Sequence, residues 1–136
     1  SLPMKGTRPR SNNIFEDNNL ANILYNSTKD RSEHLMIVDL IRNDLGKVCQ
    51  YNSIKVNNLY SIQSFETVHQ MVSQITGKLN KNISEIDIIK ALFPGGSITG
   101  APKERSMSII DSLENYNRGI WWNTTHSGQI TGFGRN

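Results

Sequence analysis

A glycine-rich string near residue 100 has the composition of a loop that holds an anion. It reads Gly95-Gly96-Ser97-Ile98-Thr99-Gly100-Ala101-Pro102-Lys103. Glycines let a backbone approach a ligand closely, and the free N–H groups at the start of the following helix favour an anion. The residue types leave two interpretations open, a cradle for a carboxylate or phosphate and a tight turn between helices. The string is neither a Walker A nor a Rossmann pattern, so it does not indicate a nucleotide site.

A second set of polar residues interrupts an apolar helical segment that begins at Glu33. Glu33 lies toward the polar end of that segment and could bind a hard cation through oxygen. Buried polar groups must be paired or must ligate something. For Asp39, Arg42 and Asp44 the favoured interpretation is a structural ion-pair network.

Two single residues have both a chemical and a structural interpretation. His69 lies in a strand-like stretch, where a lone histidine is more often structural than catalytic. Lys5 is close to Arg8 and Arg10. It is either part of a solvated basic loop or an amine that neighbouring cations make nucleophilic. The residues alone favour the structural histidine and the solvated lysine.

The elements that must position these residues follow from apolar spacing and breakers. Pro9 disfavours a helix before it, so residues 4–10 are expected to be extended. Strands are expected between 47 and 79, with a return near Asn57-Asn58, and again over 119–122. Helices are expected over 15–27, 29–45, 84–93 and 102–114. The apolar residues of 29–45 cover more than one stripe, which predicts burial on several sides, and Gly46 should follow that helix. Blocks of helices and strands favour an α+β or layered α/β fold.

Composition excludes several classes of protein. The chain has 136 residues, the size of one domain, and a net charge of +3. No apolar run approaches the ~18 residues of a membrane span, and no signal peptide is recognisable. Aromatic residues are scattered rather than interleaved with a basic stripe, so nucleic acid is not an expected partner. The single cysteine, Cys49, fits a reducing compartment, and the expected location is cytoplasmic.

Four strings occur in one order and at one family's spacing, and together they resemble the chorismate-binding enzymes. The strings are Pro3–Arg10, Glu33–Gly46, Val68–Ser73 and Pro94–Lys103. The resemblance implies a layered α/β fold with central antiparallel sheets and outer helices, incomplete here. Residues 1–120 would form a partial chorismate-binding domain, and 121–136 a diverged or truncated tail.

Within that family, a lysine at position 5 resembles aminodeoxychorismate synthase component I. The resemblance implies amination of chorismate at C4 on the route to para-aminobenzoate and folate, with Lys5 as the nucleophile. Ammonia would come from a glutamine amidotransferase subunit or domain. The alternatives are anthranilate synthase component I, which usually carries a small residue at this position, and a non-catalytic fragment.

The other roles transfer by resemblance, one position at a time. Glu33 would bind Mg²⁺, and His69 would lie near the reacting ring carbons. The loop residues that would contact substrate are Gly96, Ser97, Thr99 and Gly100. The sequence also departs from the family pattern: Trp121 replaces a tyrosine, a glycine is absent after Trp122, and later family motifs are missing. A fragment with an exposed strand edge and exposed apolar surface is therefore expected.

Overall fold

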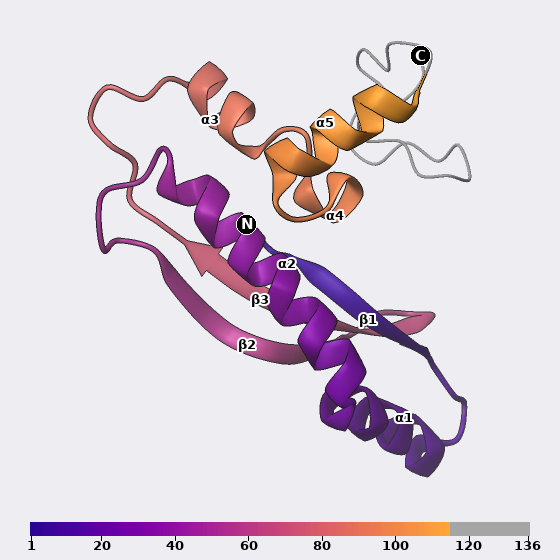
Figure 1. Cartoon of the computed structure of the whole chain (residues 1–136). Coiled ribbons are helices and arrows are strands. Elements are labelled where there is room, and N and C mark those ends of the chain that lie inside the picture. Colours follow the sequence, from indigo (N-terminus) through magenta and orange to yellow (C-terminus); the bar gives the residue numbers. More distant parts are fainter. Residues whose placement is uncertain (115–136) are drawn as a thin grey trace. The chain divides into compact units, whose positions relative to one another are not determined.

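The computed structural model of the chain describes residues 1–114 (Figure 1). The chain divides into two compact units, Ser1–Ile83 and Ser84–Asn136, and each unit is considered by itself. The expected strand over 119–122, the predicted boundary at residue 120 and the tail that holds Trp121 and Trp122 all lie outside the described residues. None of the helices within 1–114 has the length and apolar character that crossing a membrane requires.

The first unit is a three-stranded antiparallel sheet with two helices on one face (Figure 1). The strands lie in the order β1-β3-β2, so the last strand in sequence is central. Their bounds are Met4–Pro9 for β1, Lys55–Ser64 for β2 and Val68–Thr76 for β3. The helices are α1, Ile14–Asn26, and α2, Thr28–Gly46. The mixed fold and antiparallel sheet confirm the predicted class.

The core of this unit lies under the central strand. Side chains alternate across a strand, and on β3 every second one faces the helices. Four of these are at most 2% exposed: His69, Met71, Ser73 and Ile75. Two of the four are polar, so this core includes hydrogen-bonding groups that need partners.

Ser27 joins the two helices of the first unit. It ends α1, and its side-chain oxygen accepts the Asp30 N–H at the start of α2. The expected burial of α2 on several sides is wrong, because Leu35 and Met36 are exposed while Ile37 and Val38 are buried. The sheet covers only one face of the helix. Gly46 is the last residue of α2 rather than the residue after it.

The turn between β2 and β3 lies at residues 65–67, not at the predicted Asn57-Asn58. Phe65 N–H donates to the Val68 carbonyl across this turn, at 2.8 Å. The asparagines lie within β2, where its register against β3 shifts between Asn57 and Ser61. Asn58 and Tyr60 have positive φ there. The prediction mistook this irregular stretch for a hairpin turn, because asparagine is favoured in both.

The described part of the second unit is helical. It contains α3 (Glu85–Leu92), the short α4 (Gly96–Thr99) and α5 (Lys103–Leu113). A capping box begins α3, because the Ser84 side chain accepts the Asp87 N–H and the Asp87 side chain accepts the Ser84 N–H. Leu113, the last residue of α5, is 76% exposed.

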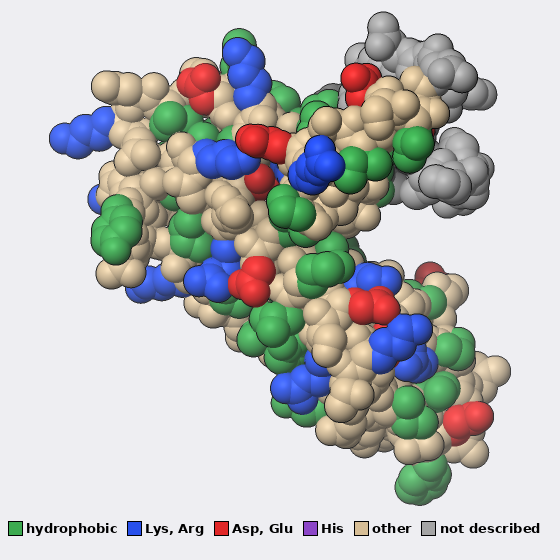
Figure 2. Space-filling view, viewed as in Figure 1, with side chains coloured by type: hydrophobic (Ala, Val, Ile, Leu, Met, Phe, Trp, Pro, Cys, Tyr) green, Lys and Arg blue, Asp and Glu red, His purple; other side chains and the backbone are tan. Residues whose placement is uncertain are grey.

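The first unit shows the expected free strand edges and apolar surface. Among the described residues, β1 and β2 each pair with β3 alone. Exposed apolar side chains of α1 and α2 include Ile14, Phe15 and Met36. On the face in Figure 2, acidic and basic side chains lie among one another.

Candidate active site

Lys5 and Glu33, two residues singled out separately from the sequence, meet in the structure. The Lys5 Nζ lies 2.9 Å from the Glu33 Oε2. Lys5 comes from β1 and Glu33 from α2. Both side chains remain accessible, at 48% and 35% exposure. An amine and a carboxylate are thus held together at a solvent-accessible point between strand and helix.

A β-bulge in β1 makes this meeting possible. Met4 pairs with Val72, but Thr7 pairs with Gln70, so β1 carries one extra residue between them. In a regular strand, Lys5 and Arg8 would face opposite sides of the sheet. With the bulge, both reach carboxylates on α2.

Gly6 is the residue that permits the bulge to lie against the helices. Its φ is +96°, a conformation that side chains rarely adopt. A Cβ at this position would lie 3.1 Å from the Leu24 Cδ1 and 3.2 Å from the Asp30 Cβ. The glycine therefore supplies both an unusual backbone conformation and a close approach to the α1–α2 junction.

The two arginines near Lys5 are each paired with an aspartate. Arg8 Nη2 lies 2.7 Å from Asp30 Oδ2, and Arg10 binds Asp17 through two of its nitrogens. The hypothesis that uncompensated arginine charges surround Lys5 is therefore not supported. Instead, Lys5, Arg8 and Arg10 each meet one carboxylate of α1 or α2. The two arginine pairs fasten β1 and the residue after it to the helices.

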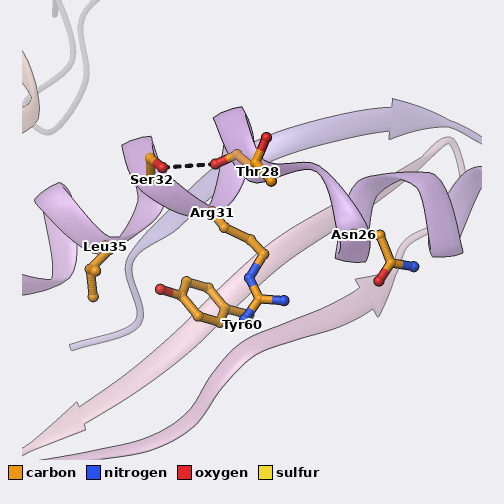
Figure 3. A pocket seen from close by; sticks show the side chains of 6 residues that line it. All are labelled: Asn26, Thr28, Arg31, Ser32, Leu35 and Tyr60. Carbon is orange, nitrogen blue, oxygen red and sulfur yellow. Dashed lines mark hydrogen bonds between the residues drawn. The ribbon is translucent and has the colours of Figure 1, made fainter.

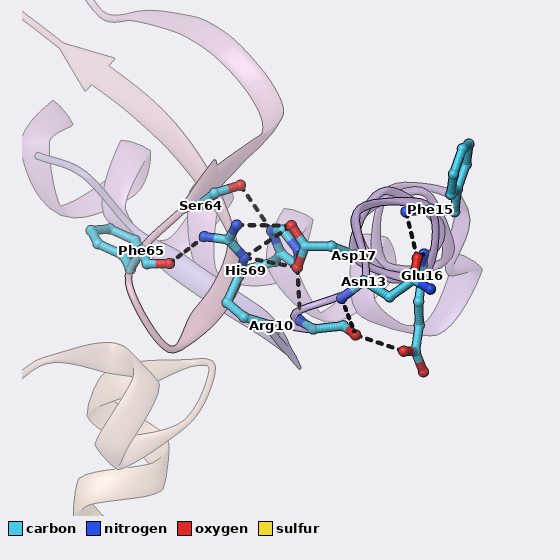
Figure 4. Close-up of polar contacts among 9 residues, drawn as sticks. Arg10, Asn13, Phe15, Glu16, Asp17, Ser64, Phe65 and His69 are labelled. Carbon is cyan, nitrogen blue, oxygen red and sulfur yellow. Dashed lines mark hydrogen bonds and ion pairs between the residues drawn. The ribbon is translucent and has the colours of Figure 1, made fainter.

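His69 lies in a buried polar network that starts from the Arg10–Asp17 pair (Figure 4). Its Nε2 lies 3.0 Å from Asp17 Oδ1, and its Nδ1 lies 2.8 Å from the Ser64 Oγ. The Arg10 guanidinium and then the Ser11 N–H hold the pKa of Asp17 far below its ordinary value. The Asp17 carboxylate can only accept a hydrogen bond, so Nε2–H donates to it. In the tautomer with its proton on Nε2, Nδ1 accepts a hydrogen bond from the Ser64 hydroxyl.

This network fixes the ring of His69 and gives it a defined tautomer. His69 is only 2% exposed and both of its nitrogens have partners. Nδ1 is the nitrogen that can exchange partners, because Ser64 is exposed at the end of β2. A substrate group that bonds Nδ1 would take the place of the serine hydroxyl.

His34 is a second buried histidine, and no role was predicted for it. Its side chain has no exposed surface, and its Nε2 lies 2.7 Å from the Ser73 Oγ. The same serine oxygen also accepts a hydrogen bond from the Tyr60 N–H. Burial holds the pKa of His34 below its ordinary value of 6.5, so the ring is neutral at pH 7.

His34 should make the protein less stable in mild acid. A histidine with a lowered pKa binds a proton more readily after unfolding, so stability falls as the pH drops below 6.5. For the wild type, the urea concentration at the midpoint of unfolding should fall between pH 7.5 and pH 5.5. For His34→Gln this midpoint should fall less over the same pH range, because glutamine does not titrate. Equal losses in the two proteins would contradict this role.

The predicted glycine loop forms α4 and its flanks. The Gly100 N–H donates to the Gly96 carbonyl at 2.8 Å, and the φ of Gly100 is +101°. Ser97 is exposed, whereas Thr99 is buried and its hydroxyl donates to the Gly100 carbonyl at 3.4 Å. The backbone thus satisfies part of the loop's hydrogen-bonding capacity, and Ser97 presents its side chain to solvent.

A hollow of about 290 Å³ lies elsewhere on the first unit, between α2 and β2 (Figure 3). The guanidinium of Arg31 lies 4.4 Å from the centre of the Tyr60 ring beside it. None of the predicted site residues lines this hollow. The stacking fastens the irregular part of β2 to α2.

Glu33 is an accessible carboxylate, a group that can bind a magnesium ion. Mg²⁺ binds one or two carboxylates together with waters and substrate oxygens. The accessible Glu33 fits one such position. Within residues 1–114, no group of three or more acidic, histidine or cysteine residues is placed to hold a metal.

Asp17 is the site residue that sequence reasoning missed, although a signal was present. Asp17, Leu20 and Leu24 are spaced three and four residues apart, so they share one face of α1. A charge on an apolar face requires a buried partner. That pattern could have predicted the ion pair, but not that Arg10 and His69 are its partners.

Comparison with known proteins agrees with this arrangement of motifs. Residues 1–124 match the profile of the chorismate binding enzyme family. The chain belongs to this family. Among solved structures of chorismate-binding enzymes, anthranilate synthase component I from Streptococcus pneumoniae TIGR4 aligns with a TM-score of 0.68 and 33% identity. That alignment covers 81% of this chain and 27% of the other.

Two relatives have a higher sequence identity to this chain than that structure does. Aminodeoxychorismate synthase component 1 of Escherichia coli (strain K12) is 51% identical over 119 residues, which make up 88% of this chain and 26% of that protein. Its Bacillus subtilis (strain 168) namesake is 46% identical over 134 residues, 98% of this chain and 27% of that protein. The chain thus spans about a quarter of the length of these two relatives.

Proposed function

We propose that this chain is the part of an aminodeoxychorismate synthase component I that carries the nucleophilic lysine. The observation behind the proposal is the accessible Lys5 amine, held 2.9 Å from the Glu33 carboxylate. The names of the similar proteins support the same branch of the family. The reaction would be amination of chorismate at C4, in the cytoplasm, with ammonia from a glutamine amidotransferase subunit or domain.

The proposed chemistry divides one difficult substitution into two easier ones. The free Lys5 amine forms a bond from Nζ to C2 of the ring, the two conjugated ring double bonds each shift by one position, and the C4–O bond breaks. The C4 hydroxyl takes up a proton and leaves as water, and the new ammonium at Nζ loses a proton. Ammonia then bonds to C4, the two double bonds shift back, and the C2–N bond breaks. The leaving Lys5 nitrogen takes up a proton as the new C4 ammonium loses one. The product is 4-amino-4-deoxychorismate, and Lys5 is regenerated.

The remaining predicted residues have supporting roles in the proposal. The loop residues Gly96, Ser97, Thr99 and Gly100 would contact chorismate. His69 would lie near the reacting carbons, with its Nδ1 as the nitrogen available to a substrate group. Glu33 would be one ligand of a Mg²⁺ ion, which when bound supplies positive charge to hold a substrate carboxylate. Anthranilate synthase component I and a non-catalytic fragment are the alternatives.

Removing the Glu33 carboxylate tests the proposed metal role. One carboxylate binds Mg²⁺ weakly, so the 136-residue chain should show no tight binding in calorimetry. A full-length synthase that contains this segment should bind Mg²⁺, and Glu33→Gln should weaken that binding by about ten-fold or more. The control is Asp39→Asn, which removes an exposed carboxylate of α2 that already pairs with Arg42. Equal affinity in the wild type and Glu33→Gln would exclude Glu33 as a ligand.

A further inference from the structure

We propose that the Lys5–Glu33 ion pair is a latch, in which Lys5 occupies the carboxylate until a divalent cation takes its place. This inference rests on the proposed function, because it concerns the same two residues. Within residues 1–114, Lys5 is the one polar partner of the Glu33 side chain. The amine proposed to attack substrate and the carboxylate proposed to hold the metal therefore block each other in the cation-free state.

The ion pairs of Lys5, Arg8 and Arg10 differ in a way that singles out the first. Asp30 and Asp17 are largely buried, with side chains 15% and 11% exposed, and hydrogen bonds hold both in place. Lys5 and Glu33 make a single contact and are the most exposed of the three pairs. Exposed ion pairs contribute little to stability. The Lys5–Glu33 pair can therefore open without loss of the contacts that fasten β1 to the helices.

One carboxylate cannot serve both cations fully. An ammonium group and a divalent cation on the same carboxylate repel each other, so each weakens the binding of the other. The coupling is reciprocal: Lys5 lowers the affinity of Glu33 for the metal, and the metal releases Lys5 from Glu33. A lysine proposed as a nucleophile would thus be freed when the divalent cation binds.

The latch predicts that removing the lysine charge tightens metal binding. In a full-length synthase that contains this segment, Lys5→Met should lower the dissociation constant for Mg²⁺ by about five-fold or more, measured by calorimetry without substrate. Lys29→Met is the matched control. Lys29 is an exposed cation four residues before Glu33 on α2, and it makes no contact with that carboxylate. Its removal should change the affinity little, because solvent screens its charge.

The same titration separates failure of the latch from failure of the proposed function. If Glu33→Gln leaves Mg²⁺ affinity unchanged, Glu33 is not a ligand and the latch falls with that role. If Glu33→Gln weakens binding but Lys5→Met matches the wild type, the latch alone is wrong. An equal gain in Lys5→Met and Lys29→Met would also overturn it, because the effect would then be general electrostatics.

A labelling experiment decides the question if Lys5→Met does not fold. An amine-reactive acetylating reagent followed by peptide mass spectrometry reports how accessible Lys5 is. Mg²⁺ should speed the labelling of Lys5 in the wild type and should have no effect on it in Glu33→Gln. Labelling of Lys5 at the same rate with and without Mg²⁺ would overturn the latch.

Discussion

Replacing Lys5 by alanine is expected to abolish glutamine-dependent amination in a full-length synthase that contains this segment. The variant lacks the atom that is proposed to bond to C2, so the two-step route is lost. We expect kcat to fall by on the order of 1,000-fold or more, which corresponds to about 4 kcal/mol. Chorismate binding should fall less, because other residues would hold the substrate.

Trapping of the lysine adduct and identification of the reaction product test this prediction directly. Wild-type protein stopped during turnover should carry an adduct on the peptide that holds Lys5, detected by mass spectrometry. Lys29→Ala, which removes a solvent-exposed amine from α2, should keep normal amination. An unchanged rate in Lys5→Ala would remove the nucleophile role. Formation of anthranilate by the wild type would instead move the protein to the other branch of the family.

Replacing Gly6 by alanine is expected to destabilise the protein and to disturb the bulge that positions Lys5. Alanine must adopt a φ of +96°, and its Cβ would press against Leu24 and Asp30. Strain of this kind costs about 1–3 kcal/mol. The variant should also lose amination activity, because relief of the strain would move the bulge and, with it, Lys5. Chemical denaturation and a rate assay on the same preparation measure both effects.

Gly46→Ala is the matched control for this substitution. Gly46 is the last residue of α2, and nothing lies within 4 Å of a Cβ added there. Alanine in a helix is more favourable than glycine by up to about 1 kcal/mol. The control should therefore be neutral or stabilising. If Gly6→Ala and Gly46→Ala are equally stable, the close approach at Gly6 does not constrain the protein.

The sequence predicted those elements of the fold that have a local cause. Helices α1, α2, α3 and α5 were found within a few residues of their ends, because apolar spacing and breakers act over short distances. The hairpin turn was placed wrongly, because Asn57-Asn58 is equally suited to the irregular stretch of β2 that the pairing with β3 determines. The burial of α2 was overestimated because its composition does not show how many neighbours cover it.

For the site, too, the sequence predicted single residues but not their partners from other elements. Resemblance identified Lys5 and Glu33 separately, and each motif is a continuous string. That they meet depends on a bulge, which the sequence contains only as a glycine beside Lys5. Likewise, His69 was singled out as one residue, whereas its partners Asp17 and Ser64 come from other elements. Side-chain partners far apart in sequence required the three-dimensional structure.

The bulge in β1 also compensates for the different rise per residue of a strand and a helix. Asp30 and Glu33 are three residues apart on α2, a rise of about 4.5 Å along the helix axis. Their partners Arg8 and Lys5 are three residues apart on β1, which would span about 10 Å in a regular strand. The extra residue removes one register step and shortens that span to about 6.6 Å, a difference that long side chains can absorb. The spacing of Lys5 and Arg8 along the strand therefore comes close to the spacing of Glu33 and Asp30 along the helix. Adding or removing one residue between Lys5 and Arg8 would disturb both pairs, whereas a substitution at Thr7 would leave their spacing intact.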